Sequence, residues 1–277
     1  MSVMTGVDPV TVGLAVVGGT GIACGAALAV AARFLSVKED PRIEKATEIL
    51  PGANCGGCGY AGCADYAKAI VLNGVAINLC SAAGEEVLAL LSEMMGVSAT
   101  AAEKRVAIVL CGGDTEKAVR RFKYNGIADC RAAHAVGGGD KGCSYGCLGY
   151  GSCSRVCPTG AIEITANQLA VVHPALCIAC GACVKVCPRS LIKIVPVSRT
   201  IHVLCRSKDK GPIVKKLCKV GCIGCTVCAK NCDEGAIVME GTLAVVDYAR
   251  PLTTDVVIEK CPTNCIVRTE TEVSDKS

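Results

Sequence analysis

Cysteine dominates the chemistry available to this sequence, since 23 of its 277 residues are cysteines. Four of them stand in CIACGACVKVCP, residues 177 to 188, with the spacing C-x2-C-x2-C-x3-C-P. This spacing is typical of runs that bind [4Fe–4S] clusters: three close thiolates reach three irons of one cubane, and the cysteine before proline reaches a neighbouring cluster. A zinc site more often uses two separated C-x2-C pairs around one ion. The run therefore predicts iron–sulfur clusters.

Exchange of the fourth ligand requires a partner run, and CSYGCLGYGSCSRVCP at 143–158 supplies one with wider spacing. Its last cysteine, Cys157, also precedes a proline. Two clusters are then predicted, one on Cys157, Cys177, Cys180 and Cys183, and the other on Cys143, Cys147, Cys153 and Cys187. We expect residues 136–198 to form a complete two-cluster module of the bacterial ferredoxin type.

A third run, CIGCTVCAKNC at 222–232, keeps the spacing but lacks the following proline. Its partner run holds Pro251, Thr254 and Val257 where three leading cysteines are expected, and only Cys261 remains, before Pro262. One cluster is predicted here, on Cys222, Cys225, Cys228 and Cys261. Residues 199–277 are thus expected to form a second, partly degenerate module in which Cys232 has no cluster to bind.

Another group lies nearer the N-terminus, in CGGCGYAGC at 55–63, and a fourth cysteine follows a short helical stretch. Four thiolates suffice for one [4Fe–4S] cluster, and the glycines let the backbone approach its sulfurs and donate N–H groups. Zinc is the alternative, because four cysteines with one C-x2-C also suit that ion. The predicted ligands are Cys55, Cys58, Cys63 and Cys80.

Four further cysteines precede the two ferredoxin-type runs in duplicated segments, where VLC at 109–111 recurs at 203–205. Pseudo-symmetric packing of the two halves predicts that they meet and bind a fifth [4Fe–4S] cluster, on Cys111, Cys130, Cys205 and Cys218. Two alternatives remain: buried free thiols, or a shifted ligand set in which Cys218 joins the run at 222. The spare cysteines are Cys24, Cys232 and Cys265.

The elements that position these cysteines begin with an uncharged stretch from Val10 to Leu35, interrupted only at Arg33. It is long enough to cross a bilayer as one helix, with a buried core helix as the alternative. GIACG at 21–25 has the small-residue spacing that lets another helix approach closely. Lys and Arg follow the stretch but do not precede it, which predicts a cytoplasmic location for the remaining chain, the basic residues being Arg33, Lys38, Arg42 and Lys45.

Helical periodicity at 40–50 and 85–95 predicts a small helical domain around the first cysteine group. Beyond residue 101, short β-branched runs alternate with cysteine-rich loops, which indicates small sheets around metal. The predicted fold class is α+β, with one N-terminal transmembrane helix. The expected domains are an N-terminus and anchor at 1–37, a four-cysteine domain at 38–98, a connecting segment at 99–135, and modules at 136–198 and 199–277.

Several function classes are disfavoured by the remaining residues. The N-terminal residues MSVMTGVDPV carry no Lys or Arg, so a cleavable signal peptide is not expected, and the length is unlike a disulfide scaffold; reduced thiols are therefore expected. No basic stripe indicates nucleic-acid binding, and no phosphate loop or catalytic acid–base pair is present. The three histidines, at 134, 173 and 202, are scattered. The formal net charge is +4, and five oxidised clusters at about −2 each would bring it to roughly −6.

Taken together, these motifs resemble the B subunit of the membrane-bound Rnf electron-transport complex. The resemblance runs from the N-terminal span through DPRIEKATEILPGANCGGCGYAGC, YNGIADCRAA, GCSYGCLGYGSC, the ferredoxin run and CKVGCIGC to the closing CPTNCI. It implies a relay subunit of an ion-translocating oxidoreductase at the inner (cytoplasmic) membrane, taking electrons from soluble ferredoxin to membrane subunits, with Na⁺ or H⁺ translocation. The degenerate last run departs from the long members of that family.

Two other interpretations of the sequence remain open at this point. The chain fits a membrane-anchored polyferredoxin serving another reductase or hydrogenase, and it fits a membrane-anchored structural zinc protein. An iron–sulfur protein absorbs broadly near 400 nm and bleaches on reduction, whereas a zinc protein is colourless.

Overall fold

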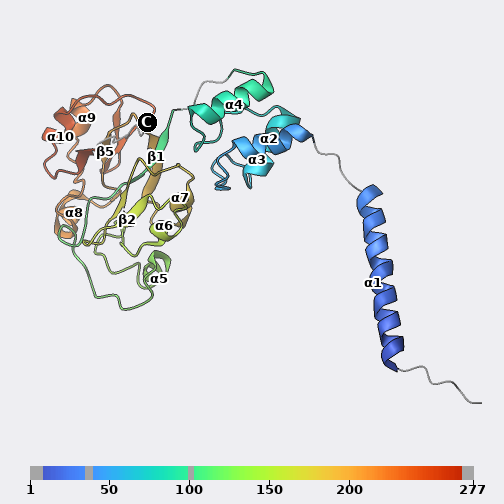
Figure 1. The fold of residues 1–277 in the computed structure, drawn as a ribbon. Coiled ribbons are helices and arrows are strands. Elements are labelled where there is room, and N and C mark those ends of the chain that lie inside the picture. The colour runs from blue at the N-terminus through green and yellow to red at the C-terminus, as the bar shows by residue number, and fades with distance from the viewer. Residues whose placement is uncertain (1–8, 35–39, 99–102, 270–277) are drawn as a thin grey trace, which may run out of the picture.

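The computed structural model describes residues 9–34, 40–98 and 103–269. Helix α1 (Pro9–Phe34) is apolar up to Arg33 in its last turn and none of its apolar stretch is buried, and it is the one candidate membrane span among the described residues. Figure 1 shows α1 apart from the rest of the chain, with α2 as the nearest element. The helix ends at Phe34, while Leu35, Lys38 and the expected boundary at 37/38 lie outside the described residues.

A small helical domain follows, built from α2 (Pro41–Ile49), α3 (Cys63–Asn73) and α4 (Glu85–Met95). Asp40 caps α2 by accepting a hydrogen bond from the backbone N–H of Arg42 at 2.9 Å, and Gly74 ends α3 in the left-handed conformation at φ 61°. The apolar faces of the three helices meet in one core, whose most buried members include Ala46, Ile70 and Leu91. This core supports the loop that carries the first cysteine group.

The first ferredoxin-like module, residues 103–198, contains two small antiparallel sheets. Strand β1 (Arg105–Val109) pairs with β4 (Ile192–Pro196), and β2 (Ile162–Ile164) pairs with β3 (Ala170–Val172). Three short helices join them: α5 (Cys130–Ala135), α6 (Ser152–Arg155) and α7 (Ala182–Val186). The expected connecting segment 99–135 therefore contributes β1 to this module, because β4 pairs with β1. It also contributes α5.

The second module, residues 199–269, repeats the arrangement. Strand β5 (Ile201–Val203) pairs with β8 (Ile266–Arg268), and β6 (Ile237–Glu240) pairs with β7 (Leu243–Val246). Its helices are α8 (Gly211–Leu217), α9 (Val227–Asn231) and α10 (Val256–Glu259). Val257 on α10 is fully buried where a cluster ligand is absent from the sequence, so apolar packing fills that part of the module.

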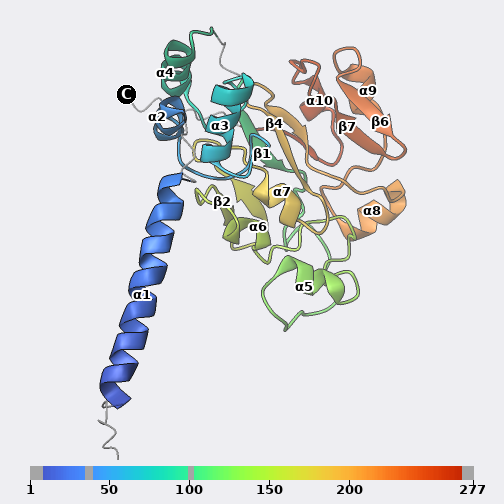
Figure 2. The ribbon, with the colours of Figure 1, turned by 90° about the vertical axis from the view of Figure 1, so that its right-hand side faces the viewer.

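The three folded parts are in contact. The helical domain meets the first module where the Ser81 hydroxyl donates to the carbonyl of Ile178 at 2.9 Å. The two modules meet through backbone hydrogen bonds from Gly112 to Leu204 at 3.0 Å and from Val119 to Leu217 at 2.9 Å. Figure 2 shows the helical domain and the second module on opposite sides of the first. The first module is therefore the central part of the molecule.

Candidate metal centres

Site 1 is the cysteine group of the helical domain, formed by Cys55, Cys58, Cys63 and Cys80. Cys63 begins α3, and its backbone N–H donates to the Asn54 carboxamide at 2.8 Å, which fixes the loop 54–63 against the helix. Gly56 and Gly59 in this loop have φ of 69° and 91°, values that favour glycine. Burial raises the pKa of the Cys80 thiol, and the neighbouring Cys58 and Cys55 add to the effect. The four expected cysteines thus come from one loop and the segment after α3.

Site 2 is a cavity in the first module lined by the four cysteines expected there, Cys157, Cys177, Cys180 and Cys183. The backbone N–H of Ala107 on β1 donates to the Cys177 sulfur at 3.4 Å, so β1 closes one wall of the cavity. Gly181, at φ 77°, turns the chain into α7 and aims the Cys183 side chain inward. Burial raises the pKa of the Cys183 thiol to about 11.

Site 3 is the neighbouring cavity, and its composition differs from the expected set. It is lined by Cys130, Cys147, Cys153 and Cys187, with Cys130 in the position expected for Cys143. The backbone N–H of Leu191 donates to the Cys187 sulfur at 3.4 Å. Burial raises the pKa of the Cys153 thiol to about 12, and the thiols of Cys147, Cys130 and Cys187 add to the effect.

Helix α5 explains the position of Cys130. Asp129 caps this helix, and its carboxylate also accepts a hydrogen bond from the Ser152 hydroxyl at 2.7 Å and pairs with Arg155. The backbone N–H of Cys130 donates to the same Ser152 hydroxyl at 2.7 Å. These contacts hold the start of α5 against α6, which carries Cys153. Cys130 therefore lies beside Cys153 although 23 residues separate them in sequence.

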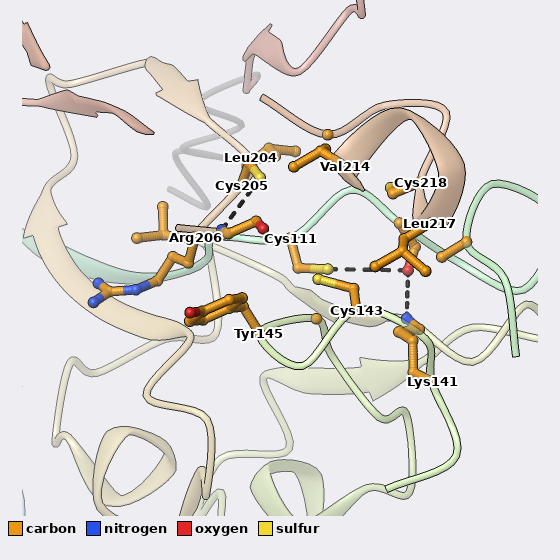
Figure 3. Close-up of a pocket in the computed structure, with 16 residues that line it drawn as sticks. Cys111, Lys141, Cys143, Tyr145, Leu204, Cys205, Arg206, Val214, Leu217 and Cys218 are labelled. Carbon is orange, nitrogen blue, oxygen red and sulfur yellow. Dashed lines mark hydrogen bonds between the residues drawn. The ribbon is translucent and has the colours of Figure 1, made fainter. Parts of the chain in front are cut away.

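Site 4 lies between the two modules and contains the cysteine that site 3 lacks. Its cavity is lined by Cys111, Cys143, Cys205 and Cys218. Figure 3 shows these side chains around the cavity, with Lys141 and Tyr145 at its edge. Two backbone hydrogen bonds hold Cys143 at this site. The N–H of Gly142 donates to the carbonyl of Val119 at 2.7 Å, and the N–H of Val119 donates to the carbonyl of Leu217, the residue before Cys218. The structure thus exchanges Cys130 and Cys143 relative to the expected sets.

Site 5 lies in the second module and contains the four expected cysteines, Cys222, Cys225, Cys228 and Cys261, together with Cys265. Cys265 was expected to be spare, yet its sulfur lies 3.6 Å from that of Cys261. It follows the Cys-Pro pair at the position of Leu191 in the first module, and it is equally buried. As a hydrogen-bond donor, the Cys265 thiol lowers the pKa of Cys261 to about 5 and that of Cys222 to about 6, while its own pKa rises.

Two expected spare cysteines stay apart from these sites. Cys232 points its thiol at the carbonyl of Ala229, 3.5 Å away, and packs against the core of the second module. Cys24 is exposed on α1. Of the histidines, His202 is buried between the Tyr248 hydroxyl at 3.0 Å and the Thr269 hydroxyl at 3.1 Å, which makes it a structural residue.

The cysteine sites suit iron–sulfur clusters better than single ions. At sites 2 to 5 the thiols ring cavities, which is what a cubane with four irons requires. Backbone N–H groups reach the sulfurs of Cys177 and Cys187, a contact that tunes cluster potentials.

Burial is the second point in favour of a bound group. A thiolate in an apolar cavity is unfavourable on its own, which is why burial raises the pKa of Cys153 and Cys205 to about 12. Coordination to iron supplies the positive charge that makes the deprotonated form stable. The residues present therefore fit the clusters that the sequence predicts.

Comparisons with known proteins agree with this chemistry. A family model described as "Putative Fe-S cluster" matches residues 50–82, which contain site 1, and the model "4Fe-4S binding domain" matches residues 170–193, which contain three cysteines of site 2. The B subunit of the ion-translocating oxidoreductase complex of Methanosarcina acetivorans is 42% identical over 91% of this chain and 96% of its own length. The chain belongs to the family of Rnf B subunits.

Two further members of this family match along most of the chain. The B subunit of the Na⁺-translocating ferredoxin:NAD⁺ oxidoreductase complex of Acetobacterium woodii is 42% identical over 94% of this chain and 78% of its own length. The B subunit of the proton-translocating ferredoxin:NAD⁺ oxidoreductase complex of Clostridium ljungdahlii is 41% identical over 89% of this chain and 88% of its own length. The shared region includes the helical domain and both modules.

Proposed function

We propose that this Rnf protein relays single electrons through [4Fe–4S] clusters within an ion-translocating ferredoxin:NAD⁺ oxidoreductase. The observation that carries the proposal is the row of five cysteine sites in three folded parts that contact one another, from the helical domain that follows α1 to the second module, where Cys225 is exposed. A bound cluster supplies a one-electron couple at each site. The protein holds the ligands, excludes water and keeps neighbouring sites in contact.

Adjacent sites share structural contacts along the whole row. A side-chain carbon added at Gly57 in site 1 would lie 3.2 Å from the Cα of Cys180 in site 2, so the two loops touch. Sites 2 and 3 lie side by side within one module, since α6 carries Cys153 of site 3 and Cys157 of site 2 follows two residues after this helix ends. The backbone N–H of Cys147 in site 3 donates to the sulfur of Cys111 in site 4 at 3.3 Å. Such contacts support transfer from one site to the next.

The two ends of the row differ in their surroundings. Site 1 lies in the domain that follows α1 in sequence, which supports transfer from this end to membrane subunits of the complex. Site 5 reaches the surface at Cys225, which is the only exposed cysteine of the described ferredoxin-like modules. We therefore propose that electrons enter at site 5 and leave at site 1.

Charge around site 5 supports soluble ferredoxin as the donor. Between residues 206 and 230 the chain has seven Lys or Arg and one Asp. Lys208 and Lys210 are exposed and form no ion pair within the described residues, and the Lys208 carbonyl accepts a bond from Thr242, which lies against the Cys222 sulfur. Each oxidised cluster adds about −2 to the protein that carries it, which shifts the charge of a small two-cluster donor toward the negative. Complementary charge speeds the encounter of two such proteins.

The remaining parts of the proposal concern the complex. The relatives are named as subunits of ion-translocating complexes, which supports association with other Rnf subunits and a location at the inner membrane. The basic residues after α1, among them Arg42 and Lys45, support a cytoplasmic location of the folded part. In this arrangement the chain contributes electron transfer, and other subunits contribute NAD⁺ reduction and the passage of Na⁺ or H⁺.

The test is anaerobic reduction of the full-length protein in detergent by a reduced two-cluster ferredoxin, followed by stopped-flow absorbance. We expect broad absorption near 400 nm that bleaches rapidly. The double variant Lys208→Glu, Lys210→Glu should slow the second-order rate roughly tenfold at low ionic strength. Lys123→Glu, an exposed lysine of the first module, is the matched control. A colourless protein refutes the relay, and equal rates for all three proteins refute entry at site 5.

A further inference from the structure

Site 4 is assembled from both ferredoxin-like modules. Cys111 follows β1 and Cys143 precedes the loop of site 3, both in the first module, while Cys205 follows β5 and Cys218 follows α8 in the second. The equivalent positions of Cys111 and Cys205 reflect the duplication, because each stands two residues after the first strand of its module. The backbone N–H of Ser207 donates to the Cys205 sulfur at 3.4 Å, an N–H···S contact like those at sites 2 and 3.

A buried cation at the edge of the cavity indicates the charge of its occupant. Lys141 lines site 4 and is 1% exposed, and its ammonium group donates to the carbonyl of Gly113. The acidic residues adjacent to Gly113 and to Lys141 in sequence form ion pairs with other partners, Asp114 with Lys117 and Asp140 with Arg120. No carboxylate pairs with Lys141 in the described ranges 9–34, 40–98 and 103–269. A buried charge without a counter-charge costs several kcal/mol in general, so an anion in the cavity is the expected partner.

A second cation faces the same region. Arg189 is half-buried, and its guanidinium donates to the carbonyls of Cys143 and Gly146, while its Nε atom is buried without a partner in the described structure. No ion pair joins Arg189 to a carboxylate within the described residues. Two cations with only carbonyl partners thus lie beside the thiols of sites 3 and 4. This arrangement suits a cofactor with net negative charge.

We propose that Cys111, Cys143, Cys205 and Cys218 hold a fifth [4Fe–4S] cluster at the interface of the two modules, with Lys141 as its buried counter-charge. The inference rests on the proposed function, since it assigns an iron–sulfur cluster to the row. A cluster with four thiolates carries about −2 when oxidised and gains one more negative charge on reduction. Lys141 therefore stabilises the reduced state more than the oxidised one and raises the reduction potential of site 4.

Site 4 connects site 3 of the first module with site 5 of the second. It touches site 3 through the contact between Cys147 and Cys111, and it touches site 5 because the backbone N–H of Cys222 lies against the Cys205 sulfur. No other group of cysteines among the described residues lies between the modules. Without an occupant at site 4, sites 3 and 5 lack a common neighbour.

Paired substitutions test the ligand set through iron content. We expect about 20 irons per chain in the wild-type protein and about 16 after Cys143→Ala or Cys218→Ala alone. The double variant of these two should also retain about 16, because both residues belong to one site. Cys130→Ala with Cys143→Ala should retain only about 12, because they belong to two sites. Cys232→Ala is the matched control and should keep all of the iron.

The opposite pattern overturns the assignment. If Cys130→Ala and Cys218→Ala behave as one site, Cys130 is the ligand and Cys143 belongs to site 3. If wild type holds about 16 irons and the four cysteine variants of site 4 keep them, the fifth cluster is absent while the relay itself stands. Electron paramagnetic resonance of the other centres shows whether a variant has folded, because their spectra persist in a folded chain.

Lys141→Met tests the counter-charge, with the exposed Lys219→Met as the control. We expect Lys141→Met to lower the midpoint potential of one centre by about a tenfold change in its reduction equilibrium, which is 59 mV for one electron. The same centre should be the one lost in Cys218→Ala. If the cavity holds no anion, replacing an unpaired buried lysine by methionine should instead leave all potentials unchanged and make the protein more stable.

Discussion

The cap of α5 is the contact on which the position of Cys130 depends, and it can be removed by one substitution. Asp129 accepts hydrogen bonds from the backbone N–H groups of Arg131 and Ala132, from the Ser152 hydroxyl and from Arg155. Asp129→Ala removes all four. Asp129→Asn keeps a carboxamide oxygen for the helix cap but loses the negative charge. The two variants therefore separate the cap from the charge.

The expected magnitudes follow from these contacts. Loss of an N-cap costs about 1 kcal/mol, and leaving the buried Ser152 hydroxyl without its acceptor adds about 1–3 kcal/mol. The exposed ion pair with Arg155 contributes less than about 1 kcal/mol. Asp129→Ala should therefore weaken the docking of α5 by about 2–4 kcal/mol.

The charge alone can be checked against the pKa of Asp129. Hydrogen bonds from Ser152 and from the helix backbone lower this pKa from 3.8 to about 2. At about 1.36 kcal/mol per pKa unit the difference is about 2.4 kcal/mol. Because the side chain is 30% exposed, screening by solvent reduces it to about 1–2 kcal/mol. Asp129→Asn should therefore cost about half as much as Asp129→Ala.

Amide hydrogen exchange measures the docking directly. For Asp129→Ala, the amides of Ala133 and Val136 should exchange about 30 to 700 times faster, at a factor of about ten per 1.4 kcal/mol. The electron paramagnetic resonance signal of site 3 should broaden at the same time. Asp40→Ala removes the cap of α2, which lies in the helical domain, and should leave that signal unchanged. Unaltered exchange in α5 after Asp129→Ala would refute the account given for Cys130.

Three further predictions follow from individual contacts. Cys232→Ser should leave iron content unchanged, because the Cys232 thiol lies against Ala229 outside the cavity of site 5; loss of about four irons would contradict this. Gly21→Leu with Gly25→Leu should release the protein from its complex but not from the membrane, because bulky residues block close helix approach; unchanged co-purification is the contrary result. Burial lowers the pKa of His202 from 6.5 to about 4, so about 3 kcal/mol of stability should be present above pH 6.5 and lost as pH falls through about 4. His202→Gln should flatten this pH dependence of unfolding, and equal pH profiles for both proteins would show that His202 is not its source.

The sequence predicted those features that depend on local spacing. The run 177–188 places three cysteines on one loop, and Cys157 before proline joins them in the same cavity. The apolar stretch from Val10 forms a helix, and the family resemblance agrees with the similarity of three relatives along about nine-tenths of the chain. In each case the pattern lies within a few residues of the structure it determines.

Other features depend on contacts between distant segments, and sequence spacing carried little information about them. Cys143 and Cys147 lie in one short run, yet they face different cavities, because Gly142 is bound to Val119 whereas Cys130 is held by Ser152. The run at 143–158 has wider spacing than the run at 177–188. This spacing is the one sequence feature consistent with its first cysteine, Cys143, lining a different site from the other cysteines of the run. Cys265 gave no signal of its proximity to Cys261, since its position in the chain is that of an apolar core residue.

The pairing of β1 with β4 also affects how the protein is made. Val109 at the end of β1 pairs with Ile192, so β1 remains unpaired until a residue more than 80 positions later in the chain has been synthesised. At about 5–20 residues per second, a ribosome needs about 4–17 s to synthesise this interval. During that time both cysteine runs of the first module emerge while the sheet that closes over them is still open. Until β4 is made, the thiols of both runs are therefore accessible to iron and sulfide, and the last strand closes the module afterwards.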